Sequence, residues 1–418
     1  MMIRQGHAPE CPERAREETM PDASLDTRSP TVPSTEVEQA PRRVSRTPSA
    51  SLVPSPHPPR TPMRNSVDPH HATRLALRRA CEYLVQTQDE DGAWRIYPLP
   101  RLLENALACV IADAFVPELR PHVTAARHWA RTAAVQRHHE LPRLIETWLQ
   151  AWLGGATPSP TLDVSAGCFS EPIFVPRRTF FLSLALAVGA PVRGGPPREV
   201  LRTQMLEQVR ARHELRLKSW SGAELAALFL LLGGTGRADD TAEALRALSE
   251  AQSPSGAFGE HLPATLVALA ALRRWAPQSE AFRRTLDFVV KTRTPEGVWC
   301  FTHADVWDTA LLCRALEDCE EPGRAAFARA RAFLLRSQNA DGGWPYRGGV
   351  ESDTDTTGMV MRAFRPFTGT AASEAGRGYL ERLRTSEGLW PTWQSRDDPP
   401  MDDVVAHAIL ALRESGAP

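Results

Sequence analysis

Residues 338–346 read QNADGGWPY, and the glutamine, glycine and tryptophan of this stretch return along the chain at the same spacing. The pattern Gln338-x3-Gly342-x-Trp344 has four counterparts, in two of which arginine replaces glutamine. They end in Trp94, Phe258, Trp299 and Trp390. From Phe258 onward the aromatic residues are 41 to 46 positions apart, which is typical of a helical hairpin repeat. The sequence therefore predicts helical hairpins joined by similar turns.

The segments that follow these turns are apolar and rich in small residues, as expected of helices packed inside a ring. They cover residues 264–272, 308–316, 355–364 and 403–412. Trp94 and Phe258 are 164 residues apart, which leaves room for about four units whose signatures have decayed. We predict an all-α fold, a single α/α barrel (toroid) over residues 72–416, with about 6–7 helical hairpins and Gln/Gly/Trp turns.

The repeated turns themselves are interpreted as structural. Glycine permits a tight turn, and the aromatic ring packs against it. Gln88, Gln252 and Gln338 are therefore expected to tie hairpins together rather than to take part in chemistry.

Composition excludes several classes of function. The 418-residue chain has a formal net charge of −1, so it lacks the basic field of a nucleic-acid-binding protein. Its seven cysteines show no paired spacing, which predicts neither a disulfide framework nor a CxxC zinc site. Residues 1–68 are rich in Pro, Ser, Thr, Arg and Glu and predict a disordered tail.

Apolar runs at residues 180–188 and 225–232 are too short to cross a bilayer. The N-terminus has no apolar region of the kind found in secretory signals. We expect a cytoplasmic protein with at most a peripheral membrane contact.

An acidic stretch, ESDTDTT at residues 351–357, precedes one of the apolar segments. Asp353 and Asp355 fit two interpretations. They can cap a helix and offset its macrodipole. A buried, neutral aspartic acid whose conjugate base is stabilised by hydrogen bonds is also a strong acid, as protonation of an isolated alkene requires.

Three segments together resemble the squalene–hopene cyclase family and, more broadly, the class II terpene cyclases. They are VWDTAL at 306–311, GGW followed by SDTDTT within 342–357, and PPMDDVVAHAIL at 399–410. The resemblance is close over residues 290–412 and extends to 72–290 only through the repeats. It implies proton-initiated cyclisation of a linear prenyl substrate.

The resemblance also implies roles for single residues. Asp355 matches the proton donor of the family's acidic motif, and Asp353 matches its partner. His407 matches a histidine that orients the donor, with Asp403 in a supporting place, although His407 also fits a histidine satisfied within the core. Thr356 stands where the commonest family pattern has a further aspartate. This DxDTT form resembles drimenyl diphosphate synthases, which act on farnesyl diphosphate.

A carbocation would need aromatic faces for cation–π attraction and apolar walls that exclude water. Trp307 matches a pocket tryptophan of the family. Phe301, Trp344, Tyr346 and Trp393 are further candidates for the substrate pocket, and each of these four also fits packing between helices.

A diphosphate substrate would need cations around it. Arg177, Arg178, Lys218 and Lys291 lie near apolar segments and are candidates to meet phosphate oxygens, although their spacing also fits a solvated surface. Mg²⁺ would accompany such a substrate, with protein ligands unknown, and no organic cofactor is expected.

We thus expect a class II terpene cyclase that converts farnesyl diphosphate to a drimane-type bicyclic diphosphate, with a C20 diphosphate or a squalene-like polyprene as alternative substrates. The chain is too short for the two barrels of larger family members, which favours a short substrate or a partner subunit that completes the cavity. A separate phosphatase would act downstream. A non-catalytic α/α toroid stays open, whereas a protein prenyltransferase β-subunit is disfavoured because no DxC zinc motif occurs.

Overall fold

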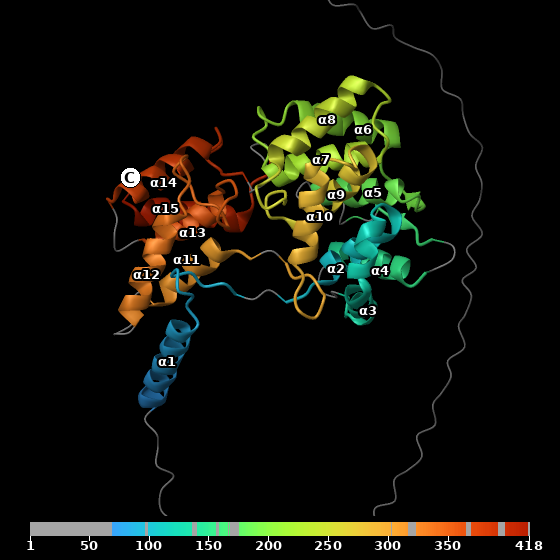
Figure 1. Cartoon of the computed structure of the whole chain (residues 1–418). Helices are drawn as coiled ribbons and strands as arrows, with labels where there is room; N and C mark the ends of the chain where they lie inside the picture. The colour runs from blue at the N-terminus through green and yellow to red at the C-terminus, as the bar shows by residue number, and fades with distance from the viewer. Residues whose placement is uncertain are drawn as a thin grey trace, which may run out of the picture. The chain divides into compact units, whose positions relative to one another are not determined.

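The computed structural model describes residues 69–96, 99–135, 140–155, 159–165, 167, 175–301, 303–316, 323–364, 369–391 and 398–416. The predicted disordered tail, residues 1–68, lies outside the described residues. The described part of the chain is mostly helical, with only two short strands (Figure 1). The prediction of an all-α fold is therefore confirmed.

The helices follow the apolar segments of the sequence. They are α1 (Pro69–Gln86), α2 (Leu102–Ala114), the 3-10 helix η1 (Pro117–His122), α3 (Thr124–Thr132), α4 (Glu140–Leu153), α5 (Val175–Ala187), α6 (Arg198–Arg210), α7 (Ser219–Leu231), α8 (Ala238–Ala251), α9 (Leu262–Trp275), α10 (Glu280–Lys291), α11 (Asp305–Leu316), α12 (Gly323–Arg336), α13 (Thr354–Ala363), α14 (Ala371–Leu383) and α15 (Asp402–Glu414). Two short strands, β1 (Leu162–Asp163) and β2 (Val192–Arg193), pair in parallel with Leu162 opposite Val192.

The repeated turn ending in Trp344 ties α12 to α14. Gln338 Nε2 donates to the carbonyl oxygens of Gly342 (2.8 Å) and Ala372 (2.9 Å), the latter in α14. Trp344 Nε1 donates to Leu334 O in α12 at 2.7 Å. Gly342 has φ +85°, and a Cβ there would lie 2.6 Å from a carbonyl oxygen of α14, so glycine is required. Because Gln338 and Trp344 donate their side-chain N–H groups to backbone carbonyl oxygens of the turn and its helices, the structural interpretation of the turn is confirmed.

The same pattern recurs at the other turns. Trp94, Trp299 and Trp390 each donate their indole N–H to the carbonyl oxygen ten residues earlier, at 2.8–2.9 Å. Gln88 and Gln252 donate to carbonyl oxygens of α12 and α10, as Gln338 does to α14. The predicted architecture of repeated helical hairpins is thus confirmed, while the number of hairpins stays a prediction.

Two turn contacts join segments that are far apart in sequence. Trp94 N donates to Thr309 Oγ1 on α11 at 2.9 Å, and Trp299 N donates to Asn105 Oδ1 on α2 at 2.8 Å. The buried apolar side chains accordingly form two clusters. One runs from Leu102 to Trp299, and the other combines Ala93 and Trp94 with residues between 306 and 411. The repeat pattern does not predict this division, because it shows which faces are buried and not what they are buried against.

Small-residue-rich helices lie inside each cluster, as the sequence predicts. In the first, α9 packs against both α7 and α2, and in the second α13 packs between α11 and α15. The close contact of α13 with α15 is the one that positions the candidate site.

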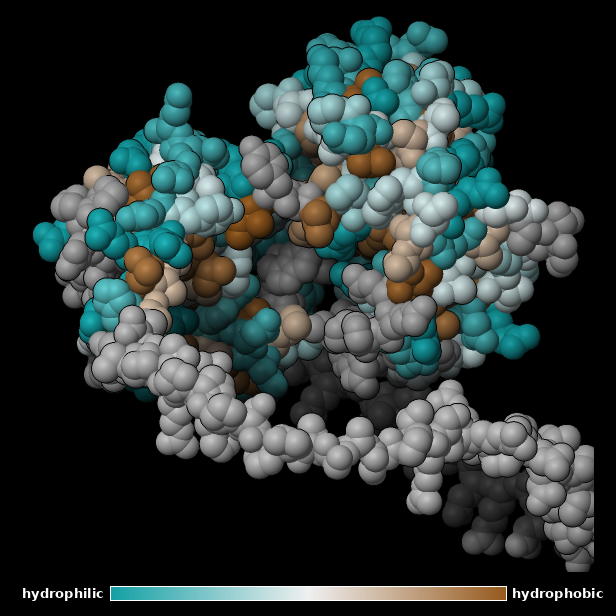
Figure 2. All heavy atoms as spheres, turned by 90° about the horizontal axis from the view of Figure 1, so that it is seen from below, coloured by the Kyte–Doolittle hydropathy of each residue, from teal (hydrophilic) through white to brown (hydrophobic). Residues whose placement is uncertain are grey.

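The surface is mainly hydrophilic on the face shown in Figure 2, where apolar residues gather in patches around a hollow. Among the described helices, none has both the length and the apolar sequence required of a membrane span. Cys81 on α1 is disulfide-bonded, which the cysteine spacing does not predict, whereas Cys109, Cys300 and Cys313 are free thiols.

Candidate active site

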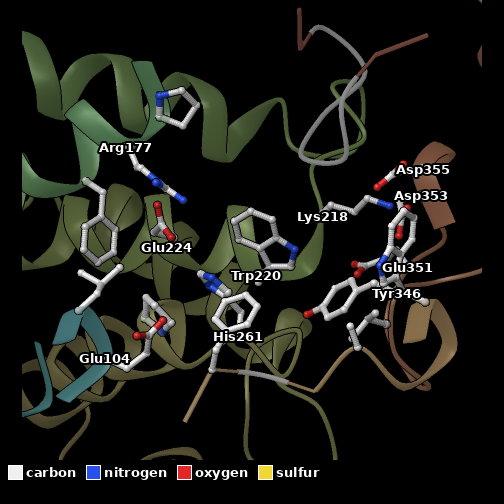
Figure 3. Close-up of a pocket in the computed structure, with 18 of the residues that line it drawn as sticks. Glu104, Arg177, Lys218, Trp220, Glu224, His261, Tyr346, Glu351, Asp353 and Asp355 are labelled. Carbon is white, nitrogen blue, oxygen red and sulfur yellow. The ribbon is translucent and has the colours of Figure 1, made fainter. Parts of the chain in front are cut away.

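A cavity of about 330 Å³ is lined by residues of α2, α5, α7, α9, α11 and α13 and of the loops before them. This volume lies within the range of ~300–1,000 Å³ typical of small-molecule sites. Its aromatic lining consists of Phe180, Phe181, Trp220, Phe301, Trp307 and Tyr346. Figure 3 shows Asp353 and Asp355 toward one side of the cavity, Arg177, Glu104 and Glu224 toward the other, and Trp220 and His261 between them.

Asp353 is the N-cap residue of α13. Its backbone is extended, and Oδ1 accepts the N–H of Thr356 at 2.7 Å. The Thr356 hydroxyl donates to Asp353 Oδ2 at 3.1 Å, so both carboxylate oxygens are bound. The side chain is only 5% exposed. Burial raises the pKa of Asp353 to about 6, although the charge of Lys218 and the bonds to Thr356 oppose the rise.

Asp355, in the first turn of α13, meets His407 on α15. Its Oδ1 lies 2.6 Å from His407 Nδ1, and the two side chains are 26% and 22% exposed. The helices approach closely here because Gly358 has no side chain: a Cβ would lie 3.0 Å from the His407 carbonyl oxygen. Asp355 also lines the cavity. A carboxyl group paired with imidazole in this way can pass a proton to a bound ligand while its conjugate base stays hydrogen-bonded.

Trp307 on α11 completes this part of the site. Its ring centroid lies 5.5 Å from that of His407, and its side chain lines the cavity. Tyr346 lines the cavity too, and its hydroxyl donates to Gly259 O at 2.9 Å. Phe301 also lies in the wall, beneath the Arg101 guanidinium at 4.2 Å from the ring centroid.

Two other aromatic candidates do not line the cavity. Trp344 is fully buried in the second apolar cluster, where its indole N–H is bound to Leu334 O. Its assignment to the pocket is therefore wrong, and the alternative of packing between helices holds. Trp393 lies outside the described residues.

The supporting role implied for Asp403 is also corrected. Its side chain is exposed at the start of α15, and Oδ1 accepts the N–H of Val404 at 2.9 Å. A residue four positions before His407 shares its helix face, but here Asp403 is directed to its own helix terminus.

Of the four cations predicted to meet a diphosphate, Arg177 and Lys218 line the cavity. Arg177 on α5 lines the cavity, whereas its neighbour Arg178 does not. Lys218 lines the cavity close to the acidic residues and donates from Nζ to Ser352 O. Lys291 is exposed and bound to Asp287 on its own helix at 2.6 Å.

Several cavity residues were not predicted from the sequence. Glu224 on α7 and His261 before α9 both line the wall. Burial raises the pKa of Glu224 to about 8 and lowers that of His261 to about 3. His261 Nδ1 accepts the N–H of Ala264 at 3.4 Å and so caps α9. The sequence offers a signal only for His261, which follows the Phe258 turn where a helix must begin.

Glu104 and Arg101 line the cavity, with Glu104 on the side opposite Asp353 and Asp355 (Figure 3). The Glu104 side chain is fully buried, and within the described part of the chain neither of its carboxylate oxygens accepts a hydrogen bond. The nearest cation is Arg101, with a nitrogen 3.4 Å from Glu104 Oε1. Burial raises the pKa of Glu104. This carboxyl group is thus available to a ligand.

The chain is similar in sequence to known proteins. The chain is 28% identical over 384 residues to a drimenyl diphosphate synthase of Streptantibioticus cattleyicolor, in a match that covers 83% of the chain and 66% of the relative. It is 32% identical over 346 residues to a drimenyl diphosphate synthase of Streptomyces showdoensis, covering 77% of the chain and 60% of the relative. This chain is similar in sequence to drimenyl diphosphate synthases.

A probable squalene–hopene cyclase of Sinorhizobium fredii is 25% identical over 183 residues, covering 34% of the chain and 28% of the relative. No family model matches the chain. The resemblance to squalene–hopene cyclases, inferred from three short segments, is confirmed, and so is the resemblance to drimenyl diphosphate synthases, inferred from Thr356. The assignment of the DxDTT motif itself stays a prediction. The chain spans less than two thirds of the length of both drimenyl diphosphate synthases.

Proposed function

We propose that this protein is a class II terpene cyclase that converts farnesyl diphosphate to a drimane-type bicyclic diphosphate. The observation that carries the proposal is the bond between Asp355 Oδ1 and His407 Nδ1 at the wall of an aromatic-lined cavity. The similarity to drimenyl diphosphate synthases supports the choice of a short substrate that carries a diphosphate.

In the proposed reaction Asp355 gives its proton to the terminal alkene of the folded chain. The remaining alkenes attack in turn, so that each new carbon–carbon bond moves the positive charge to another carbon. His407 stays bonded to the Asp355 carboxylate. The Trp307 ring stabilises the cation, with a contribution of roughly 0.5–2 kcal/mol. Loss of one proton from the final cation restores an alkene, and the carbon–oxygen bond to the diphosphate is never broken.

The diphosphate of such a substrate lies at the end opposite the alkene that is protonated. Arg177 lines the cavity away from Asp355 (Figure 3), and Arg101 also lines it, with a nitrogen 3.4 Å from Glu104 Oε1. These two arginines are the proposed diphosphate ligands. Glu104 has two oxygens free of hydrogen bonds beside them, which suits a carboxylate ligand of Mg²⁺. No group of three or more His, Cys, Asp or Glu side chains in the described residues could hold a metal alone, so the diphosphate would supply the remaining ligands. Mg²⁺ would neutralise diphosphate charge during binding.

The proposed reaction needs a further enzyme downstream. A drimane-type diphosphate would be consumed by a phosphatase, because the cyclase itself leaves the phosphate ester intact. We also propose a partner subunit that completes the cavity.

Incubation of the purified chain with farnesyl diphosphate, geranylgeranyl diphosphate and squalene, with and without Mg²⁺, tests the proposal. Products are analysed by mass spectrometry before and after phosphatase treatment, and circular dichroism verifies that the protein is folded. We expect a bicyclic product from farnesyl diphosphate that retains its diphosphate. Release of diphosphate without added phosphatase would contradict the mechanism. Absence of any cyclic product from folded protein would favour a binding toroid.

A further inference from the structure

Two consecutive residues before α13, Glu351 and Ser352, are hydrogen-bonded to the start of α7. Glu351 accepts the Ser219 N–H through Oε1 at 2.6 Å and the Ser219 hydroxyl through Oε2 at 3.1 Å. Lys218, the N-cap residue of α7, donates from Nζ to the carbonyl oxygen of Ser352. Asp353, which follows, caps α13. The N-termini of α7 and α13 are therefore linked through residues 351–353.

Lys218 is half-buried, and it lines the cavity together with Asp353 and Asp355 (Figure 3). A buried ammonium group is unfavourable unless negative charge is close to it. Burial lowers the pKa of Lys218, and the charges of Asp353 and Glu351 counteract this. The lysine and the acidic residues thus stabilise each other's charged forms.

We infer that Lys218 is a positioning residue of the acid centre and not a ligand of the diphosphate, an inference that rests on the proposed function. Its bond to Ser352 fixes the peptide that leads into Asp353. Its positive charge acts on the carboxylate of Asp353, two residues before the donor, and so lowers the negative charge against which Asp355 must lose its proton. A better stabilised conjugate base makes a stronger acid, which protonation of an alkene requires.

Thr356 strengthens this inference. At this position the chain carries a neutral hydroxyl, bound to Asp353 Oδ2. A neutral Thr356 and a cationic Lys218 both lower the negative charge around Asp355. Arg177 and Asp355 line opposite sides of the cavity (Figure 3). A linear chain whose terminal alkene contacts Asp355 would therefore hold its diphosphate toward Arg177 and away from Lys218.

Several charged or titratable groups interact with Asp353 and would influence its titration. Lys218 and Asp355 act on Asp353, and the phenols of Tyr346 and Tyr379 lie within its influence. Replacing Lys218 by methionine removes the positive charge and keeps much of the volume. Arginine restores the charge and the capacity to donate to Ser352.

The experiment compares the full-length wild type with Lys218→Met and Lys218→Arg, and uses Lys291→Met as a control that removes an exposed charge on α10. The kcat for farnesyl diphosphate is measured against pH, and calorimetry gives the Kd for inorganic diphosphate. We expect Lys218→Met to lower kcat by up to roughly tenfold, because the acid is weaker without the positive charge. The fall of kcat at alkaline pH should move to higher pH, and Lys218→Arg should recover most of the rate. The Kd should match that of the wild type.

A second measurement needs no substrate. Carbon-13 NMR of aspartate carboxyl groups, with Asp353→Asn to assign the signal, should show Asp353 taking up its proton at higher pH in Lys218→Met. An unchanged titration would overturn the inference even if the enzyme is active. A weakened Kd with normal kcat would make Lys218 a diphosphate ligand instead. Equal losses of activity and thermal stability, with no rescue by arginine, would reduce it to a structural residue. Inactivity of the wild type on every prenyl substrate would count against the proposed function, whereas the titration would still test Lys218.

Discussion

Asp355 Oδ1 lies 2.6 Å from His407 Nδ1, although 52 residues separate the two in sequence. The bond joins the first turn of α13 to the middle of α15 at the point where Gly358 lets the helices meet. Trp307 stands beside the histidine ring, 5.5 Å from it. A carboxyl group, a histidine and an aromatic face are thus brought to one place by two helix–helix contacts, α13 with α15 and α11 with α13.

Asp355→Asn should abolish cyclisation and leave the fold intact. The amide keeps the shape of the carboxyl group but has no proton to transfer, so we expect turnover to fall by at least about 10²–10⁴-fold, the range of general acid catalysis. Product formation and circular dichroism measure the two effects. Asp287→Asn, an exposed carboxylate on α10, is the matched control and should stay within about twofold of the wild type. Substantial turnover by Asp355→Asn would remove Asp355 as the donor.

Trp307→Leu should slow the reaction more than Trp307→Phe. Phenylalanine keeps an aromatic face toward a cation, whereas leucine keeps only apolar bulk. A contribution of ~0.5–2 kcal/mol corresponds to a difference of about 2- to 30-fold in kcat between the two variants. Chromatography should also detect more water-captured alcohol from the leucine variant. Equal rates and identical products would mean that Trp307 only fills space.

Gly358→Ala tests the contact between α13 and α15. A Cβ would lie 3.0 Å from backbone atoms of His407, so one helix must shift. Overpacking of this kind lowers the free energy of unfolding by about 1–3 kcal/mol, and the shift should disturb the bond between Asp355 and His407. Urea denaturation and kcat report the two effects.

The control for this variant is Gly378→Ala on α14. A Cβ there meets only an arginine terminus at 3.4 Å, so alanine should stabilise the helix by up to about 1 kcal/mol. Two variants with the same stability would show that α13 and α15 do not meet closely at Gly358.

Arg177→Met should weaken substrate binding more than it slows chemistry. A hydrogen bond to a charged group contributes about 1.5–3 kcal/mol, so KM should rise by roughly 10- to 100-fold with a smaller change in kcat. Calorimetry with inorganic diphosphate should show the same loss, and Lys291→Met should bind as the wild type does. Normal diphosphate affinity in Arg177→Met would place the diphosphate elsewhere.

Asp353 should make stability depend on pH. Its pKa rises on folding from 3.8 to about 6, so the native state binds the proton more tightly than the unfolded state. This stabilisation is fully present below pH ~4 and is lost as pH rises through 6, with a size on the order of 3 kcal/mol. Asp353→Asn keeps a side-chain oxygen that can cap α13, but its amide group does not ionise. The difference in unfolding free energy, wild type minus Asp353→Asn, should therefore decrease between pH ~4 and ~6.5 in urea titrations. If the unfolding free energies of the two proteins changed with pH in parallel, the raised pKa of Asp353 would be contradicted.

Much of the local structure could be predicted from the sequence. The spacing of Gln338, Gly342 and Trp344 specifies a turn whose bonds are made mostly within ten residues, so the sequence contains nearly all of its determinants. The same holds for Asp353, because the hydrogen bond by which it caps α13 reaches only three residues along the chain, from Asp353 to Thr356. The assignment of Trp344 to the pocket is wrong because an aromatic residue in a repeated turn does not show whether its ring faces a cavity or packs between helices.

Tertiary structure decided what the motifs are packed against. The backbone N–H of Trp94 donates to Thr309, and that of Trp299 donates to Asn105, so each hydrogen bond joins residues about two hundred positions apart. Glu104, Glu224 and Lys218 belong to the site only because α2 and α7 line the same cavity as the start of α13. Periodicity fixes which face of a helix is apolar, since that depends on residues three and four apart. The choice of neighbour, the burial of a carboxyl group and its pKa depend on long-range packing, which no local pattern records.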